Sequence, residues 1–376
     1  MKPSRLRLAA ALMIAAAFVV VWISNRKPAT IPKAEIESSH RTRATPPDIE
    51  QEREISDKTA RRKMEGDWNG LLQWLRSEPR PSPDEVRKRL LALRIEWTAI
   101  DPQVRAEMIA LLLESGADAA TGLDFKVGNH GQLAGWPTLR TFLLDVLATA
   151  DPEMSPDIAR RVLDRTDSAD EFATGLRSLT REKMGRADDG ELLERFGKML
   201  GRAEWRQSRA FAEAFDLVRF VGTPEAARLL ADWQGNPSLK TMAMGEFAAE
   251  HPAAMLKVLQ DDTTPLDAAT RASLMARMDP ADAAQLAAVD SYLRDPARTP
   301  EEAAAFLKTY PLRSATTGFR LYGKTPSPYT FDRIAAGDRI AEKQVAQWLA
   351  DPALEKFKPG LTTSHQRLQQ WVDEAK

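Results

Sequence analysis

Apolar residues recur at intervals of three and four along most of the chain. In one stretch Val86, Leu90, Leu93, Trp97 and Ile100 follow one another at spacings of 4-3-4-3. This spacing places the five side chains on one face of an α-helix. Shorter stripes of the same kind predict further helices around residues 172–179, 211–218, 226–233 and 345–348. Most stripes of this kind are helix faces that pack against a core, and we interpret these stripes as core-forming faces.

The predicted helices share a start signal, in which Ser, Thr or Asp directly precedes Pro. The side-chain oxygen can accept a free backbone N–H of the first turn, while Pro gives up a donor that the helix could not use. Ser82 and Thr299 are also followed by Glu three residues later, which predicts two complete capping boxes. The signal occurs at Ser82, Asp101, Asp151, Ser155, Thr223, Thr264, Asp279, Asp295, Thr299 and Asp351.

Short connections between these starts predict antiparallel helix pairs. The Asp-Pro and His-Pro turns are unevenly spaced, so the pattern is not a strict repeat. In this organisation the chain resembles α-helical repeat proteins of the HEAT-like or tetratricopeptide-like kind. The resemblance concerns architecture alone, because the full tetratricopeptide signature is absent and no functional residue carries over. It implies an all-α fold, an irregular helix-pair solenoid over residues 66–376.

One interruption of the helical pattern lies at residues 121–136. Leu123, Phe125 and Val127 alternate with polar residues and are followed by Gly128-Asn129-His130-Gly131. Alternation before residues that tolerate positive φ predicts a small β-hairpin inserted between helices.

A second interruption, at residues 312–329, is rich in Thr, Ser, Gly and Pro and predicts an irregular loop. Irregular insertions in a rigid scaffold often carry function. Asn129, His130 and Trp136 of the hairpin are therefore the candidate interaction residues. In the alternative interpretation, the hairpin only caps or bridges two helices.

Residues 1–24 predict a membrane anchor. Leu8–Ile23 are sixteen consecutive apolar residues, about 24 Å long as a helix, and the basic residues on both sides can snorkel to the interface. The alternative is a cleaved secretory signal, but its small-residue site, Ala15–Ala17, lies inside the apolar run. We expect a retained signal anchor in the inner (cytoplasmic) membrane. The short N-terminal tail then stays in the cytoplasm, and the C-terminal domain is extracytoplasmic, or periplasmic in a diderm bacterium.

Two segments connect the anchor to the helical part. Residues 25–47 combine Pro, Thr and Ser with basic side chains and predict a disordered linker. Residues 48–65 predict a solvated, charged stalk helix, with Glu54–Lys58 and Asp57–Arg61 as favourable i,i+4 pairs.

Charge and composition narrow the classes of partner. The chain has 53 Lys and Arg against 54 Asp and Glu, but residues 1–45 hold eight basic and two acidic side chains, so the remainder is acidic. The basic arm beside an apolar segment suits anionic lipid headgroups, whereas an acidic body is poorly suited to nucleic acid. The absence of cysteine excludes thiolate catalysis, Cys-ligated zinc and iron–sulfur clusters.

Gly318-Phe-Arg-Leu-Tyr-Gly323-Lys324-Thr325 matches the phosphate-binding pattern G-x-x-x-x-G-K-T. In a nucleotide site this loop follows a buried strand and opens a helix whose N–H groups cradle phosphates. Here no apolar strand precedes Gly318, and Pro326 and Pro328 would interrupt the helix. A nucleotide-binding protein is therefore the least favoured alternative.

The remaining chemistry is sparse. The four histidines lack the spacing that places two metal ligands on one helix face, and no G-x-S-x-G elbow occurs. We expect no cofactor, no metal and no catalytic residue. The sequence indicates a non-enzymatic, membrane-anchored scaffold that binds a protein partner. The main alternative is a carbohydrate-active enzyme of the α/α-toroid type, because a closed ring of about a dozen helices shares this pattern.

Overall fold

The computed structural model describes residues 47–375, apart from residues 152, 183–188, 262, 313–317 and 324–330. Arg53–Lys376 form one compact unit, called the helical domain below, and Met1–Glu52 form a second unit. The predicted anchor at 1–24, and the predicted linker up to residue 46, lie outside the described residues. In the part of the chain that is described, no helix has both the length and the apolar character needed to span a bilayer.

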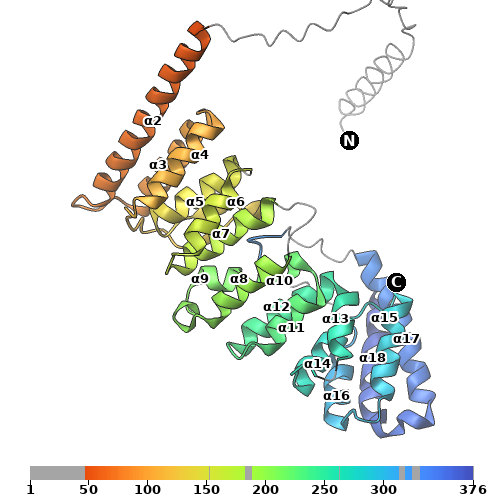
Figure 1. Ribbon diagram of the computed structural model, residues 1–376. Helices are drawn as coiled ribbons and strands as arrows, with labels where there is room; N and C mark the ends of the chain where they lie inside the picture. The colour runs from red at the N-terminus through yellow and green to blue at the C-terminus, as the bar shows by residue number, and fades with distance from the viewer. Residues whose placement is uncertain are drawn as a thin grey trace, which may run out of the picture. The chain divides into compact units, whose positions relative to one another are not determined.

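The helical domain is mostly α-helical and contains one small two-stranded sheet (Figure 1). In its first half the α-helices are α2 (Pro47–Leu75), α3 (Pro83–Thr98), α4 (Pro102–Glu114), α5 (Leu139–Ala150), α6 (Ser155–Leu163), α7 (Ala169–Glu182), α8 (Asp189–Gly201), α9 (Arg209–Glu213) and α10 (Asp216–Val221). In its second half they are α11 (Pro224–Asp232), α12 (Pro237–Glu250), α13 (Pro252–Leu259), α14 (Ala268–Met275), α15 (Ala283–Arg294), α16 (Pro300–Thr309), α17 (Phe331–Ala350) and α18 (Lys358–Glu374). The 3₁₀ helices are η1 (Asn129–Gly131), η2 (Ala203–Trp205) and η3 (Pro352–Phe357).

The predicted stalk and the first core helix are one helix. Helix α2 continues through residue 65 without a break, so the helix does not end at the predicted boundary between stalk and helical domain. Residues 50–56 are exposed, whereas Met64, Trp68 and Leu71 are buried. The charged half of α2 is thus solvated, and its apolar half belongs to the core.

Five of the ten predicted start signals cap a helix, and the helices after Thr264 and Asp279 are capped instead by Asp267 and Asp282. The five caps are Ser82, Asp101, Thr223, Thr299 and Asp351. Ser82 forms a complete capping box with Glu85, and Asp101 accepts the N–H groups of Gln103 and Val104. At Thr299 the predicted box is only half formed. The Thr299 side chain accepts the N–H of Glu302, but the Glu302 carboxylate instead accepts from Arg298 and, at 2.8 Å, from the Tyr292 hydroxyl. A buried hydroxyl needs a partner, and this requirement outweighs the second half of the cap.

Helices pack mainly against neighbours that are close in sequence, such as α6 on α7, α14 on α16 and α17 on α18. The predicted stripe of α3 is buried from Val86 to Trp97, and Ile100 packs against the same core half-buried. Each large apolar side chain buried in this way contributes about 1.5–3 kcal/mol relative to exposure. Because the apolar faces meet one another in a continuous core, the stripes are core-forming as predicted.

The predicted hairpin is present but short. Strand β1 (Lys126–Val127) pairs antiparallel with β2 (Leu133–Gly135), with Lys126 opposite Gly135 and an irregularity after it. Helix η1 forms the turn between the strands, and Leu123 and Phe125, which precede β1, are buried. The described part of the predicted loop at 312–329 forms no helix or strand. Its Gly318–Gly323 stretch lies among helices from the middle of the chain, where Figure 1 shows a short blue segment beside α7 and α10.

Candidate interaction site

Residues Gly318–Gly323, called the strap below, form an irregular segment bent at Leu321–Gly323. The strap contacts helices that precede it by 72 to 149 residues. Its hydrogen-bond partners are the side chains of α9, α10 and α12 and one carbonyl of α7. The three acceptor side chains, called the strap carboxylates, are Glu213, Asp216 and Glu246.

Asp216, the first residue of α10, receives two consecutive main-chain donors of the strap. Its Oδ2 lies 2.8 Å from the main-chain nitrogen of Tyr322 and 2.8 Å from that of Gly323. Hydrogen bonds with one ionised partner contribute about 1.5–3 kcal/mol each, more than neutral ones do. Asp216 therefore fixes the bent end of the strap to α10.

The other two carboxylates bind the first half of the strap. Glu246 Oε1 accepts the N–H of Gly318 at 2.6 Å, and Glu213 Oε2 accepts that of Arg320 at 3.3 Å. These donors belong to the main chain, so the interaction does not depend on the side chains that the strap carries.

Arg219 balances this negative charge from within the core. Its Nε donates to Asp216 Oδ1 at 2.8 Å, one helical turn away, and its Nη2 donates to the Phe319 carbonyl at 3.1 Å. Both side chains of this ion pair are almost completely buried. Burial raises the pKa of all three strap carboxylates, because a charged carboxylate loses water there.

Apolar side chains of the strap complete the attachment. Phe319 and Leu321 are 3% and 1% exposed, and the ring centroid of Phe319 lies 6.3 Å from that of Phe215. The hydroxyl of Tyr322 donates to the Ala173 carbonyl on α7 at 2.9 Å. The strap is thus bound through both its main chain and alternate apolar side chains.

The glycines of the strap are explained by close approach. A Cβ on Gly318 would lie 2.8 Å from Glu246 Oε1, and one on Gly323 would lie 2.8 Å from Arg219 Nη2. The G-x-x-x-x-G spacing therefore places two residues without side chains where the main chain meets charged groups. A phosphate-binding loop uses glycine for the same steric reason but offers its N–H groups to an anion ligand. Here the N–H groups are bonded to carboxylates, and Lys324 and Thr325 lie outside the described residues.

The predicted hairpin reaches the strap through Gly131. This residue has φ +71°, and a Cβ there would lie 2.7 Å from the Leu321 carbonyl oxygen. The Gly131 carbonyl in turn accepts from Arg177, which forms a buried ion pair with Asp145. The hairpin turn thus lies close to the strap, and α7 is hydrogen-bonded to both of them.

The three predicted interaction residues occupy different environments. Asn129 is exposed at the start of η1. His130 lies in η1, and its side chain is outside the described part. Trp136 is completely buried and donates from Nε1 to Asp145 Oδ2 at 2.9 Å. Their role in binding stays a prediction. Of the described hairpin residues, Gly131 is the one that closely approaches the strap.

Sequence reasoning missed the residues that bind the strap. The available signal was a charged pair, Asp216 and Arg219, inside the apolar run Phe215–Phe220. Charges in such a run are seldom buried without partners. The identity of the partner, a segment 100 residues away, could not be inferred from that run.

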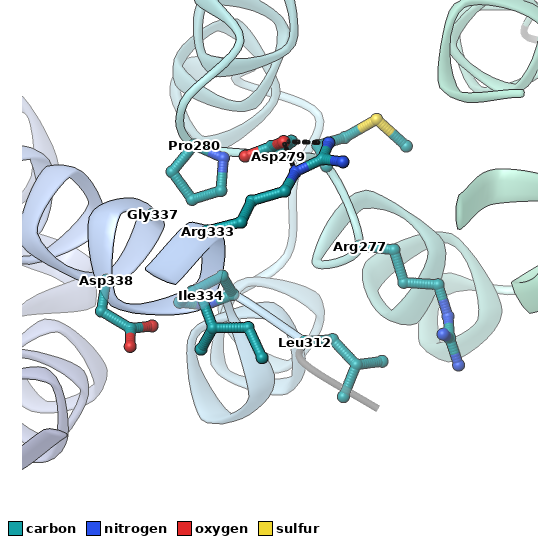
Figure 2. A pocket seen from close by; sticks show the side chains of 10 residues that line it. Arg277, Asp279, Pro280, Leu312, Arg333, Ile334, Gly337 and Asp338 are labelled. Atoms are coloured by element: carbon teal, nitrogen blue, oxygen red, sulfur yellow. Dashed lines mark hydrogen bonds and ion pairs between the residues drawn. The ribbon is translucent and has the colours of Figure 1, made fainter. Parts of the chain in front are cut away.

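Two pockets lie away from the strap. Figure 2 shows a pocket between the Asp279–Pro280 turn and α17, where Arg333 reaches Asp279 with an Nη2–Oδ2 distance of 2.7 Å. Its volume of about 40 Å³ is far below that of sites for small molecules. A wider depression of about 480 Å³ lies at Phe172, Lys198 and Trp205. Two charged residues on its wall, Arg202 and Asp167, pair with each other at 2.9 Å.

No group of three or more His, Asp or Glu side chains in the described ranges is arranged to hold a metal ion. Comparison of the chain with protein families, curated proteins and solved structures finds no match.

Proposed function

We propose that this protein is a non-enzymatic, membrane-anchored, extracytoplasmic scaffold that binds a protein partner. The single observation that carries the proposal is the strap, a peptide segment bound across α9, α10 and α12 through its main chain. Helix surfaces that bind one polypeptide segment in this way have the donors, acceptors and apolar contacts that binding to another protein requires. An irregular helix-pair solenoid is the architecture we propose for this surface.

The membrane part of the proposal comes from the sequence. Residues 8–23 form the anchor, residues 25–47 form the linker, and the charged half of α2 forms the stalk. Protease added to intact spheroplasts should then remove the helical domain, while detergent should be needed to release the anchor from the membrane fraction. Protection of the helical domain in intact spheroplasts would contradict the extracytoplasmic placement.

Partner binding is tested by site-specific photo-crosslinking in intact membranes. A photoreactive amino acid at Asn129, exposed two residues before Gly131, should give one adduct of defined mass. The same amino acid at Gln369, exposed on α18, is the matched control and should not give this adduct. Identical adducts at both positions would indicate non-specific contact and contradict the proposal.

The enzymatic alternative is tested with the same protein. The strap carboxylates converge, as acids in a catalytic pit do, but their oxygens are bonded to strap N–H groups. Polysaccharide hydrolysis by the purified chain that disappears in Asp216→Asn would contradict a scaffold and favour the toroid enzyme.

A further inference from the structure

We infer that the strap is an internal ligand of a peptide-binding site, and that a segment of the partner protein takes its place when the partner binds. The inference rests on the proposed scaffold function and specifies the partner. The partner would present a non-helical segment with an aromatic and an aliphatic residue two positions apart, flanked by glycines.

The site consists of elements that are separate from the strap. Its polar contacts come from residues 173–246, within α7, α9, α10 and α12, whereas the strap begins at Gly318. Helix α7 packs directly on α9, and α10 packs directly on α12. Helix α8 packs on both α7 and α10, and none of these helix contacts involves the strap.

The contacts made by the strap are ones that another chain can supply. Four main-chain N–H groups donate to the strap carboxylates, and one carbonyl accepts from Arg219. Every residue except proline carries the required donor. Side-chain selection concerns glycine at the two ends, apolar residues at the positions of Phe319 and Leu321, and the Tyr322 hydroxyl, which donates to the Ala173 carbonyl. Arg320 contributes its N–H, so its side chain is not part of the required pattern.

An empty site would be unfavourable. Without the strap, all three strap carboxylates would lose their main-chain donors. Glu213 would keep Arg209 and Asp216 would keep Arg219, whereas Glu246 would lose the N–H of Gly318. Unsatisfied buried charges destabilise a fold more than an unmade contact between neutral groups does. The site therefore favours exchange of one peptide for another over simple release. Because the strap is tethered, its effective concentration is on the order of millimolar, and a free peptide competes poorly against it.

The experiment uses the full chain in detergent and a labelled probe peptide, acetyl-Gly-Phe-Arg-Leu-Tyr-Gly-amide, which copies the strap. Wild type is compared with the double variant Phe319→Ser, Leu321→Ser, which removes two apolar contacts of the strap and substitutes no residue of the helices. Fluorescence anisotropy should show that the peptide binds the variant at least about tenfold more tightly than wild type, because the tethered competitor is weakened. The matched control peptide carries N-methyl groups on its tyrosine and final glycine, which removes both donors to Asp216. It should bind at least about tenfold more weakly than the probe, because a charged hydrogen-bond acceptor is left without donors.

Several outcomes would overturn the inference. A folded double variant that binds neither peptide would do so, as would equal binding of the probe and its N-methylated control. Should the variant not fold, hydrogen exchange on wild type decides, since excess probe should accelerate exchange of the Tyr322 and Gly323 amides and unchanged exchange contradicts displacement. A mixed dimer of variant and wild type, detected by light scattering, would assign the site to a second copy of the chain instead. None of these results alters the crosslinking outcome at Asn129, so failure of the inference is distinguishable from failure of the scaffold function.

Discussion

Asp216 Oδ2 lies 2.8 Å from the main-chain nitrogen of Gly323, although 107 residues separate them in the sequence. The same oxygen accepts the N–H of Tyr322, and the other carboxylate oxygen pairs with Arg219. One buried side chain thus connects the middle of the chain to a segment near its C-terminal end. This contact joins parts of the chain that the sequence-local packing of helices does not bring together.

Removal of the Asp216 carboxylate should be strongly destabilising. Asp216→Ala removes the buried partner of Arg219, which keeps only the more exposed Glu250 at 3.5 Å, and leaves two strap N–H groups without an acceptor. We expect a loss of about 3–5 kcal/mol in the free energy of unfolding. Urea titration followed by circular dichroism measures the loss.

Asp84 offers a matched control, because it forms the same i,i+3 pair with Arg87 while its side chain is 84% exposed. Asp84→Ala should change the free energy of unfolding by less than about 0.5 kcal/mol. Similar losses in the two variants would show that the buried position of the Asp216 pair is not important.

The contact between the hairpin turn and the strap is tested at Gly131. Gly131→Ala places a Cβ 2.7 Å from the Leu321 carbonyl oxygen at a φ of +71°. Gly122 is the matched control, because its φ is +73° but no atom lies within 4 Å of an added Cβ. The left-handed conformation should cost both variants about 1–2 kcal/mol, and the clash should cost Gly131→Ala about 1–3 kcal/mol more. Urea titration compares them, and equal losses would contradict the contact.

Trp136 and Asn129 should differ in how they affect stability. Trp136→Phe removes a buried donor to Asp145 and should lower the free energy of unfolding by about 1.5–3 kcal/mol. Asn129→Ala, at an exposed position, should change it by less than about 0.5 kcal/mol. Thermal unfolding of both variants tests this difference. A stable Trp136→Phe variant would show that the indole hydrogen bond is dispensable, whereas loss of the crosslinked adduct in a stable Asn129→Ala variant would indicate direct contact with the partner.

Mild acid should stabilise the helical domain. Burial raises the pKa of each strap carboxylate in the folded state, so the folded protein binds protons more readily than the unfolded chain does. The free energy of unfolding should therefore rise as the pH falls from 7 toward the unfolded pKa values of about 4. Conversely, the free energy of unfolding should fall as the pH rises through the folded pKa values, because the buried carboxylates then become charged.

Other carboxylates act in the opposite direction. The side chains of Arg61 and Arg160 hold the pKa values of Glu107 and Glu191 below their ordinary value, and this stabilisation is lost at more acidic pH. Urea midpoints at pH 7 and pH 5 measure the predicted rise. The double variant Glu213→Gln, Glu246→Gln should show a smaller rise, and an unchanged slope would mean that these two groups do not cause it.

Local chemistry explains which elements were predictable. The Ser82 cap depends on residues within one helical turn, so sequence spacing was sufficient to predict it. The cap at Thr299 has the same spacing, yet the Glu302 carboxylate bonds the Tyr292 hydroxyl instead. That preference depends on helix packing, which spacing does not reveal.

The strap shows the same limit at the level of function. The sequence determined that Gly318 and Gly323 lack side chains, and it therefore determined that the main chain there can approach other groups closely. It did not determine whether those groups are phosphates or carboxylates, because glycine serves both for the same steric reason. The helical periodicity, most caps and the hairpin follow from interactions between residues near one another in the chain. The tertiary structure alone decided that the strap meets Asp216, Glu213 and Glu246, because burial and charge compensation depend on which distant segments share one interior.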